Sequence, residues 1–139
     1  MSDVELSPYI FFKGNAREAM EFYKDAFGGE LDISTIDEAP AGTPTMPGTK
    51  PSDVMHASLR GGAVAVLASD SPNASAQTAK VELSLDGKDE AKLRTIFDKL
   101  SEGGKVKMPL KDQFWGATFG SLTDKFGVEW MVNIQKEAA

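Results

Sequence analysis

The 139-residue sequence predicts an α+β protein made of two βαβββ modules that together form an incomplete barrel. An internal repeat is the main observation. Gly14, a helical pattern and Gly28 recur as Gly87, a second helical pattern and Gly103, which lie 73 and 75 residues further along the chain. A hairpin-like pair of apolar runs follows in each half. A repeat of this length indicates two copies of one supersecondary unit.

The first module begins with a strand and an amphipathic helix. Residues 7–12 are apolar and aromatic, which is typical of a strand. Asn15 followed by Glu18 resembles a capping box, and apolar residues then recur at helical spacing. Gly28 can adopt the left-handed conformation that ends a helix. The pattern therefore predicts a helix over 15–27.

A strand, a long loop and a hairpin complete the first module. Residues 31–36 are predicted to form the strand. The segment 38–53 contains four prolines, which cannot donate hydrogen bonds to a sheet, so we expect a flap or a poorly ordered loop. The runs 54–60 and 63–69 are separated by Gly61-Gly62, which predicts a hairpin with a two-residue turn.

The second module repeats this order after a linker over 70–79. Residues 80–85 alternate strictly between polar and apolar, which predicts a strand with one apolar face. Leu93, Ile96, Phe97 and Leu100 then form a helical stripe, so a helix is predicted over 89–101. The remaining strands are predicted at residues 106–110, 115–123 and 128–135.

Composition limits the partners and the compartment. The net charge is −6 and there is no cysteine, which suits a reducing compartment. Lys and Arg are not clustered as phosphate binding requires. There is no signal-peptide pattern, and no apolar run approaches the roughly 20 residues of a membrane span. We expect one cytoplasmic domain, 1–139, with modules at 7–69 and 80–135, that binds neither nucleic acid nor membrane.

One face of the second sheet is predicted to be polar. Glu82 and Ser84 alternate with apolar residues on one strand, and Glu129, Met131 and Asn133 do so on another. A polar sheet face in so small a domain favours a concave pocket over a second core. These residues are therefore candidates for contact with a small-molecule ligand.

Several segments resemble one protein superfamily. They are Ser7-Pro8-Tyr9, Glu21 to Lys24, Val54 to Ala57, Phe114-Trp115-Gly116 and Thr123 to Asn133. Together with paired βαβββ modules, they resemble the vicinal oxygen chelate superfamily of glyoxalase I, extradiol dioxygenases and bleomycin-resistance proteins. Within this superfamily, these sequence segments are most similar to the PhnB-like branch, whose members are often labelled 3-demethylubiquinone-9 3-methyltransferase-like. The resemblance covers nearly the whole chain.

The resemblance implies four positions for a divalent metal, one on each of the first, fourth, fifth and eighth strands. They fall on Pro8, near Leu67, on Lys80 and on Met131. Proline and leucine offer no donor, a protonated lysine repels a cation, and a thioether is a poor ligand for Mg²⁺ or Mn²⁺. We therefore expect no metal and no other cofactor. The methyltransferase label also lacks support, because no glycine-rich strand-to-helix loop is present.

The candidate site residues each have a functional and a structural interpretation. His56, the single histidine, is either a general base or polar anchor, or a strand residue bonded to the backbone. With Glu82 and Glu129, His56 could form a metal site displaced from the four implied positions. The interpretation of both carboxylates as ordinary polar side chains is favoured over this one. Phe114 and Trp115 either stack on a ligand or pack in a core or an interface. Tyr9 and Phe12 are predicted core residues.

Two functions compete. The first is a metal-free small-molecule-binding protein of the glyoxalase and bleomycin-resistance type, acting as a homodimer. Its expected ligand contacts are His56, Glu82, Phe114, Trp115, Glu129, Met131 and Asn133. The alternative is an enzyme of the same superfamily whose catalytic centre is His56 or a displaced metal. A domain that acts only through protein contacts is a third interpretation, and no feature of the sequence favours it.

Overall fold

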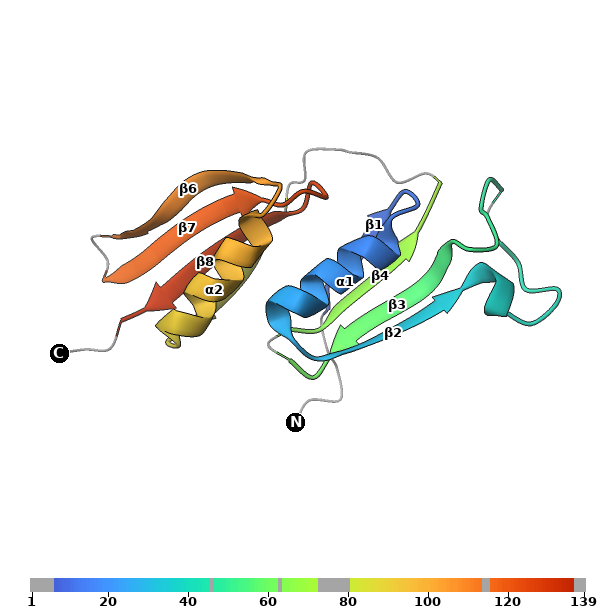
Figure 1. Ribbon diagram of the computed structural model, residues 1–139, viewed down its shortest axis with the longest axis horizontal. Helices are drawn as coiled ribbons and strands as arrows, with labels where there is room; N and C mark the ends of the chain where they lie inside the picture. Colours follow the sequence, from blue (N-terminus) through green and yellow to red (C-terminus); the bar gives the residue numbers. More distant parts are fainter. Residues whose placement is uncertain (1–6, 46, 63, 73–80, 114–115, 137–139) are drawn as a thin grey trace. The chain divides into compact units, whose positions relative to one another are not determined.

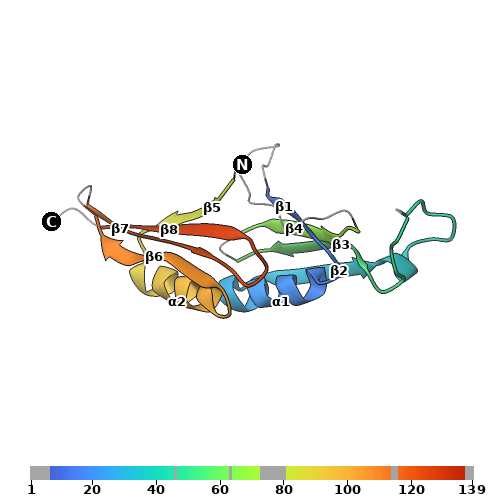
Figure 2. The same ribbon diagram turned by 90° about the horizontal axis from the view of Figure 1, so that it is seen from above.

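The chain folds into two compact units, Met1–Ser75 and Ala76–Ala139. The computed structural model describes residues 7–45, 47–62, 64–72, 81–113 and 116–136. Each unit contains one long helix and one four-stranded sheet, and the helix covers a single face of its own sheet (Figures 1 and 2). The predicted α+β class with two βαβββ modules is confirmed.

In the first unit the strands lie in the order β1-β4-β3-β2. Strands β1 and β4 are parallel, and the other neighbours are antiparallel. The elements are β1 (Tyr9–Phe12), α1 (Ala16–Phe27), β2 (Glu30–Thr35), the short 3₁₀ helix η1 (Ile36–Glu38), β3 (Val54–Arg60) and β4 (Val66–Asp70).

The second unit has the same topology, with strand order β5-β8-β7-β6. Strands β5 and β8 are parallel and the other neighbours antiparallel. The elements are β5 (Leu83–Gly87), α2 (Glu90–Ser101), β6 (Lys105–Asp112), β7 (Ala117–Thr123) and β8 (Glu129–Gln135). None of the helices in the described ranges is long and apolar enough to cross a membrane.

A buried aspartate, not Asn15, fixes the start of α1. Asn15 makes no side-chain capping hydrogen bond, so the predicted capping box is wrong. Instead the Ala16 N–H donates to Asp70 Oδ1 at 2.9 Å, and the Val54 N–H donates to Asp70 Oδ2 at 2.8 Å. Asp70 lies at the end of β4, so one carboxylate joins the beginnings of α1 and β3 to a third element. Because Asp70 is far from Ala16 in the sequence, no local sequence pattern predicts this hydrogen bond.

The connection between β3 and β4 is longer than the predicted two-residue turn. Strand β3 ends at Arg60 and β4 begins only at Val66. A Cβ atom on Gly62 would lie 2.8 Å from the Phe27 carbonyl oxygen, and one on Gly29 would lie 2.6 Å from the Arg60 carbonyl oxygen. The glycines are therefore required where the end of α1 and this connection pack backbone against backbone, and the hairpin opens to make that contact.

The segment after η1 is closed at its base by two backbone hydrogen bonds. The Ile36 N–H donates to the Asp53 carbonyl at 3.0 Å, and the Asp37 N–H donates to the Pro51 carbonyl at 2.9 Å. The two ends of the predicted loop 38–53 therefore meet beside β2 and β3. Its mobility stays a prediction.

The turn between β7 and β8 is organised by Asp124, which is 3% exposed. Its Oδ1 accepts the N–H groups of Phe126 at 2.8 Å and Val128 at 3.0 Å. Its Oδ2 accepts the indole N–H of Trp130 at 2.9 Å. Gly127 has a φ of +87°, as predicted for this turn. The carboxylate thus ties the turn to the largest side chain of the second core.

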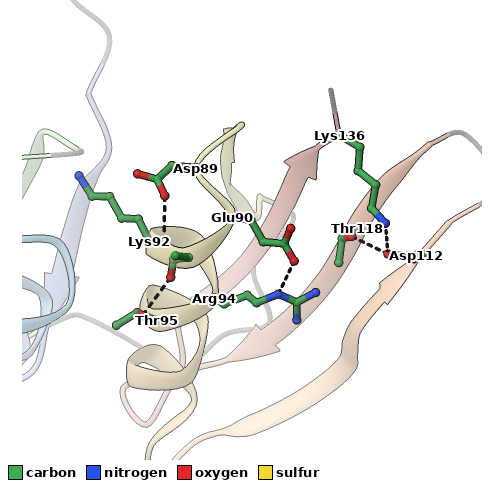
Figure 3. Close-up of polar contacts among 9 residues, drawn as sticks. Asp89, Glu90, Lys92, Arg94, Thr95, Asp112, Thr118 and Lys136 are labelled. Atoms are coloured by element: carbon green, nitrogen blue, oxygen red, sulfur yellow. Dashed lines mark hydrogen bonds and ion pairs between the residues drawn. The ribbon is translucent and has the colours of Figure 1, made fainter. Parts of the chain in front are cut away.

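Polar contacts also fix the ends of the second unit (Figure 3). Asp89 caps α2 by accepting the Lys92 N–H at 3.1 Å. Asp112, at the end of β6, accepts the Thr118 hydroxyl at 2.7 Å and pairs with Lys136 Nζ at 2.8 Å. Lys136, followed by Thr118, holds the pKa of the Asp112 carboxyl below its ordinary value. The ends of β6, β7 and β8 are thereby held together.

Candidate functional site

The face of the second sheet opposite α2 is lined mainly by polar side chains. The register pairs Ser84 with Met131 across β5 and β8, and Asp86 with Asn133. Residues paired across a sheet share a face, and Trp130, Val132 and Ile134 occupy the other, buried face. The structure therefore places Ser84, Glu129, Met131 and Asn133 on one helix-free face, as their alternation predicts.

An ion-paired triad lies at one end of this polar face. Lys107 Nζ lies 3.0 Å from Glu82 Oε1 and 3.0 Å from Glu129 Oε1. Hydrogen bonds to Glu129 and then Glu82 raise the pKa of the Lys107 ammonium, so the lysine stays protonated. Sequence reasoning missed Lys107, which lies on the strand farthest from β5.

A register irregularity lies at Lys107 on β6. Val106 pairs with Leu122 and Met108 pairs with Ser121, so two steps on β6 oppose one step on β7. Lys107 is the additional residue, and such a bulge redirects a side chain. The triad therefore depends on tertiary pairing that the strand pattern of β6 does not reveal.

The helix-free face of the first sheet carries three rings, which we call the aromatic face: Tyr9, Phe11 and His56. The ring centroids of Tyr9 and Phe11 are 5.0 Å apart, and those of Tyr9 and His56 are 5.9 Å apart. The Tyr9 hydroxyl lies 3.4 Å from His56 Nδ1, a long hydrogen bond. His56 thus lies on an exposed surface with an aromatic hydroxyl as its neighbour.

The core prediction for strand β1 is half right. Phe12 is buried at 4% exposure, as predicted, but Tyr9 is 41% exposed. Phe11, which was not singled out, is 58% exposed. The sequence pattern could have predicted the shared exposure of Tyr9 and Phe11. Alternation along a strand places Tyr9 and Phe11 on one face and Ile10 and Phe12 on the other.

The predicted ligand contacts fall into three groups. Glu82 and Glu129 are brought together by Lys107, with Met131 and Asn133 on the same face. His56 belongs to the first unit, where it meets Tyr9. Phe114 and Trp115 lie outside the described residues, as does Lys80, one of the implied metal positions.

The residues at the implied metal positions do not fit a metal ion. The Leu67 N–H donates to the Pro8 carbonyl at 2.9 Å, so these two positions are neighbours on β1 and β4, and neither side chain carries a donor atom. Met131 offers only a thioether, a poor partner for a hard cation. In the described parts of the chain, no three His, Asp or Glu side chains are grouped as a metal site requires.

Comparison with solved structures identifies the fold. The chain is similar to a bleomycin resistance determinant encoded on the transposon Tn5, with a TM-score of 0.56 at 15% identity, over 97% of this chain and 99% of that one. At this identity the likeness shows the fold alone. The protein therefore has the glyoxalase/bleomycin-resistance fold.

The family follows from closer similarities. Residues 4–133 match the model of the family described as 3-demethylubiquinone-9 3-methyltransferase, and the chain belongs to that family. It is 34% identical to Protein YjdN of Escherichia coli K12, over 95% of this chain and 96% of the relative.

Two solved structures are also similar. Protein PA1353 from Pseudomonas aeruginosa has a TM-score of 0.79 at 38% identity, with 97% of this chain and 100% of that chain covered. A putative 3-demethylubiquinone-9 3-methyltransferase, PhnB protein, from Bacillus cereus has a TM-score of 0.72 at 29% identity, with 94% and 99% covered. The resemblance to the PhnB-like branch is confirmed.

Proposed function

We propose that this protein binds a small organic molecule without a metal ion, on a helix-free face of one of its sheets. The observation that carries the proposal is the donor set at the implied metal positions. Pro8 and Leu67 have no ligating atom, and Met131 has only a soft sulfur. Chemistry that needs a divalent metal to polarise substrate oxygens has no support from these residues.

The Glu82–Lys107–Glu129 triad supports the same proposal. Glu82 and Glu129 are the two acidic side chains of the displaced metal site that the sequence leaves as an alternative. The Lys107 ammonium lies within 3.0 Å of both, so a positive charge of the chain itself satisfies the pair. An external cation would have to displace it.

An enzyme that uses His56 is the second candidate. The observation in its favour is the Tyr9 hydroxyl, 3.4 Å from His56 Nδ1, on a surface open to a ligand. An imidazole can accept and donate protons, and a phenol can orient it. A bound compound that wild-type protein converts, and that His56→Gln binds but leaves unchanged, would favour this candidate.

The proposal is tested by a thermal-shift screen of uncharged small molecules with and without EDTA. A ligand that binds only the folded state raises the melting temperature. We expect stabilising compounds to act equally in both buffers. If stabilisation disappears in EDTA and returns with added Mn²⁺, Ni²⁺ or Zn²⁺, the protein depends on a metal and the proposal is wrong.

A further inference from the structure

The middle of the polar face of the second sheet is apolar. Met108 on β6 pairs with Ser121 on β7, and Ser121 pairs with Met131 on β8, so these residues form one row across the sheet. Phe119 is two residues from Ser121 on β7 and therefore lies on the same face. Met108 is 47% exposed, and Met131 and Phe119 are half-buried. We call Met108, Met131 and Phe119 the apolar floor.

The apolar floor is a surface on which a ligand can lie, and it contains no slot. Ser121 is 6% exposed although it lies on the face opposite α2, so the longer side chains around it shield it. A ligand would therefore contact the thioethers and the Phe119 ring from above. Thioethers adapt to the shape of an apolar partner and make favourable contacts with aromatic rings. The apolar floor thus favours an aromatic group.

A hydrogen-bond donor lies at one end of the apolar floor. The Lys107 ammonium has three N–H groups, and among the described residues only Glu82 and Glu129 accept from it. The Lys107 side chain is 32% exposed, so a ligand can reach the third N–H. Glu129 and Met131 are two residues apart on one face, which separates their backbones by about 7 Å. One small ring system can therefore reach both the ammonium and the floor.

The charges on the polar face favour an uncharged ligand. Its carboxylates and ammonium groups balance among the described residues: they are Glu82, Asp86 and Glu129 against Lys105, Lys107 and Lys111. A ligand carboxylate at the third N–H of Lys107 would meet the like charges of Glu82 and Glu129, which is costly. A carbonyl oxygen can accept this hydrogen without that cost.

We propose that Lys107, Met108, Phe119 and Met131 form a binding site for an uncharged aromatic compound that carries a carbonyl oxygen. The ring lies on the apolar floor, and the oxygen accepts the third N–H of Lys107. Glu82 and Glu129 hold the ammonium in place, so the donor is oriented before the ligand binds. This inference rests on the proposed function, selects the second sheet and names the class of ligand.

The test compares 4-chromanone with chroman, which has a CH₂ group in place of the carbonyl, in NMR titrations of the isotopically labelled full chain. We expect 4-chromanone to bind about tenfold more tightly, the value of one hydrogen bond from a charged donor. Its shift changes should be concentrated in β6, β7 and β8. Equal affinities, or shift changes confined to the aromatic face of the first sheet, would overturn the inference.

Lys107→Met tests the hydrogen bond itself. In this variant 4-chromanone and chroman should bind equally tightly, because the donor is lost. Lys105→Met makes the same change of charge two residues away on β6, and should keep the preference for 4-chromanone. A Lys107→Met protein that still prefers 4-chromanone would refute the role of Lys107.

Met108→Ser tests the apolar floor without disturbing the triad. This variant should weaken the binding of both compounds alike, by roughly two- to tenfold, the value of one contact between sulfur and an aromatic ring. Val106→Ser is the control, because Val106 is 41% exposed on the opposite face of the same strand. Its affinities should be unchanged, and full affinity in Met108→Ser would show that the ligand does not lie on the floor.

Two further outcomes separate this inference from the proposed function. If 4-chromanone does not bind while other uncharged compounds stabilise the protein in EDTA, the inference fails and the proposed function stands. If neither 4-chromanone nor any other uncharged compound binds without an added metal ion, both fail.

Discussion

At the residue scale, two buried aspartates organise the two units in different ways. Asp70 joins the first residues of α1 and β3 through two backbone N–H groups. Asp124 holds the β7–β8 turn and the indole of Trp130. A buried carboxylate is costly unless hydrogen bonds satisfy it, and within the described residues each buried polar side-chain atom has a partner.

Replacing Asp124 should destabilise the second unit strongly. Asp124→Ala removes three hydrogen bonds to a carboxylate and leaves the buried indole N–H of Trp130 without this acceptor. We expect the free energy of unfolding to fall by about 2–4 kcal/mol. Urea denaturation followed by tryptophan fluorescence measures it. Asp98→Ala, on the exposed side of α2, should change it by less than about 0.5 kcal/mol; equal losses in the two variants would show that Asp124 has no special role.

Glu38 should titrate below its ordinary range. Its Oε1 accepts the Thr35 backbone N–H at 2.8 Å and the Thr35 hydroxyl at 2.9 Å, and these two bonds lower the pKa of Glu38. Because the folded-state pKa is lowered, the stabilisation is present above the unfolded-state pKa and is lost as the pH falls through the folded-state value. Carboxyl ¹³C shifts follow the titration. Thr35→Val should raise the Glu38 titration midpoint part of the way toward its value in the urea-unfolded chain. If Glu38 in the folded wild-type protein already has the midpoint of the urea-unfolded chain, the two hydrogen bonds do not lower its pKa.

At the element scale, the glycines after each helix are fixed by close contact between helix ends and strand connections. Gly29 lies against the Arg60 carbonyl in the first unit, and Gly104 lies against Thr123 and Asp124 in the second. The repeat of glycine pairs in the sequence therefore records one structural requirement twice, namely backbone contact between the helix end and the end of the third strand in each module.

Two neighbouring glycines provide a matched test of this requirement. Gly28 and Gly29 both have positive φ, but a Cβ on Gly28 meets nothing within 4 Å, whereas one on Gly29 would lie 2.6 Å from a carbonyl oxygen. Gly28 has φ +78° and ψ −169°, a region that essentially only glycine occupies, so Gly28→Ala should cost about 1–3 kcal/mol of unfolding free energy. Gly29→Ala should cost about 1–3 kcal/mol more, because the backbone must shift. Urea midpoints compare them, and equal costs would be evidence against the contact.

The helices were predictable from sequence because their determinants are local. The predicted ranges 15–27 and 89–101 each begin one residue before the observed helix, at the capping position. Strand β4 starts three residues later than predicted, and Gly62 in the connection before it packs against the end of α1. Strand β1 was correctly placed, yet its exposed face was misassigned.

The residues of the candidate site could be predicted only where strand alternation determines which side chains share a face. The shared face of Glu129, Met131 and Asn133 follows from a period of two. Lys107 was missed because its partners depend on the strand order, which brings β6 onto the same sheet as β5 and β8. The pairing of Tyr9 with His56 was missed because parallel pairing of β1 with β4, and antiparallel pairing of β4 with β3, bring together residues 47 positions apart.

At the scale of the whole molecule, each sheet ends in two outer strands, β1 and β2 in one unit and β5 and β6 in the other. Open edges of this kind favour association. We therefore predict a symmetric homodimer, the commonest closed assembly. Sedimentation equilibrium at tens of micromolar should give about twice the chain mass of 14.9 kDa. A single species at the chain mass would contradict this prediction.

For the molecule as a whole, we propose that ligand binding needs no metal ion. The most direct measurement is elemental analysis of the full chain purified without chelator, after gel filtration. The donor set at Pro8, Leu67 and Met131 and the ammonium of Lys107 predict far less than one divalent metal ion per chain. One metal ion per chain, lost in His56→Ala or Glu129→Gln, would contradict the account and favour the enzyme.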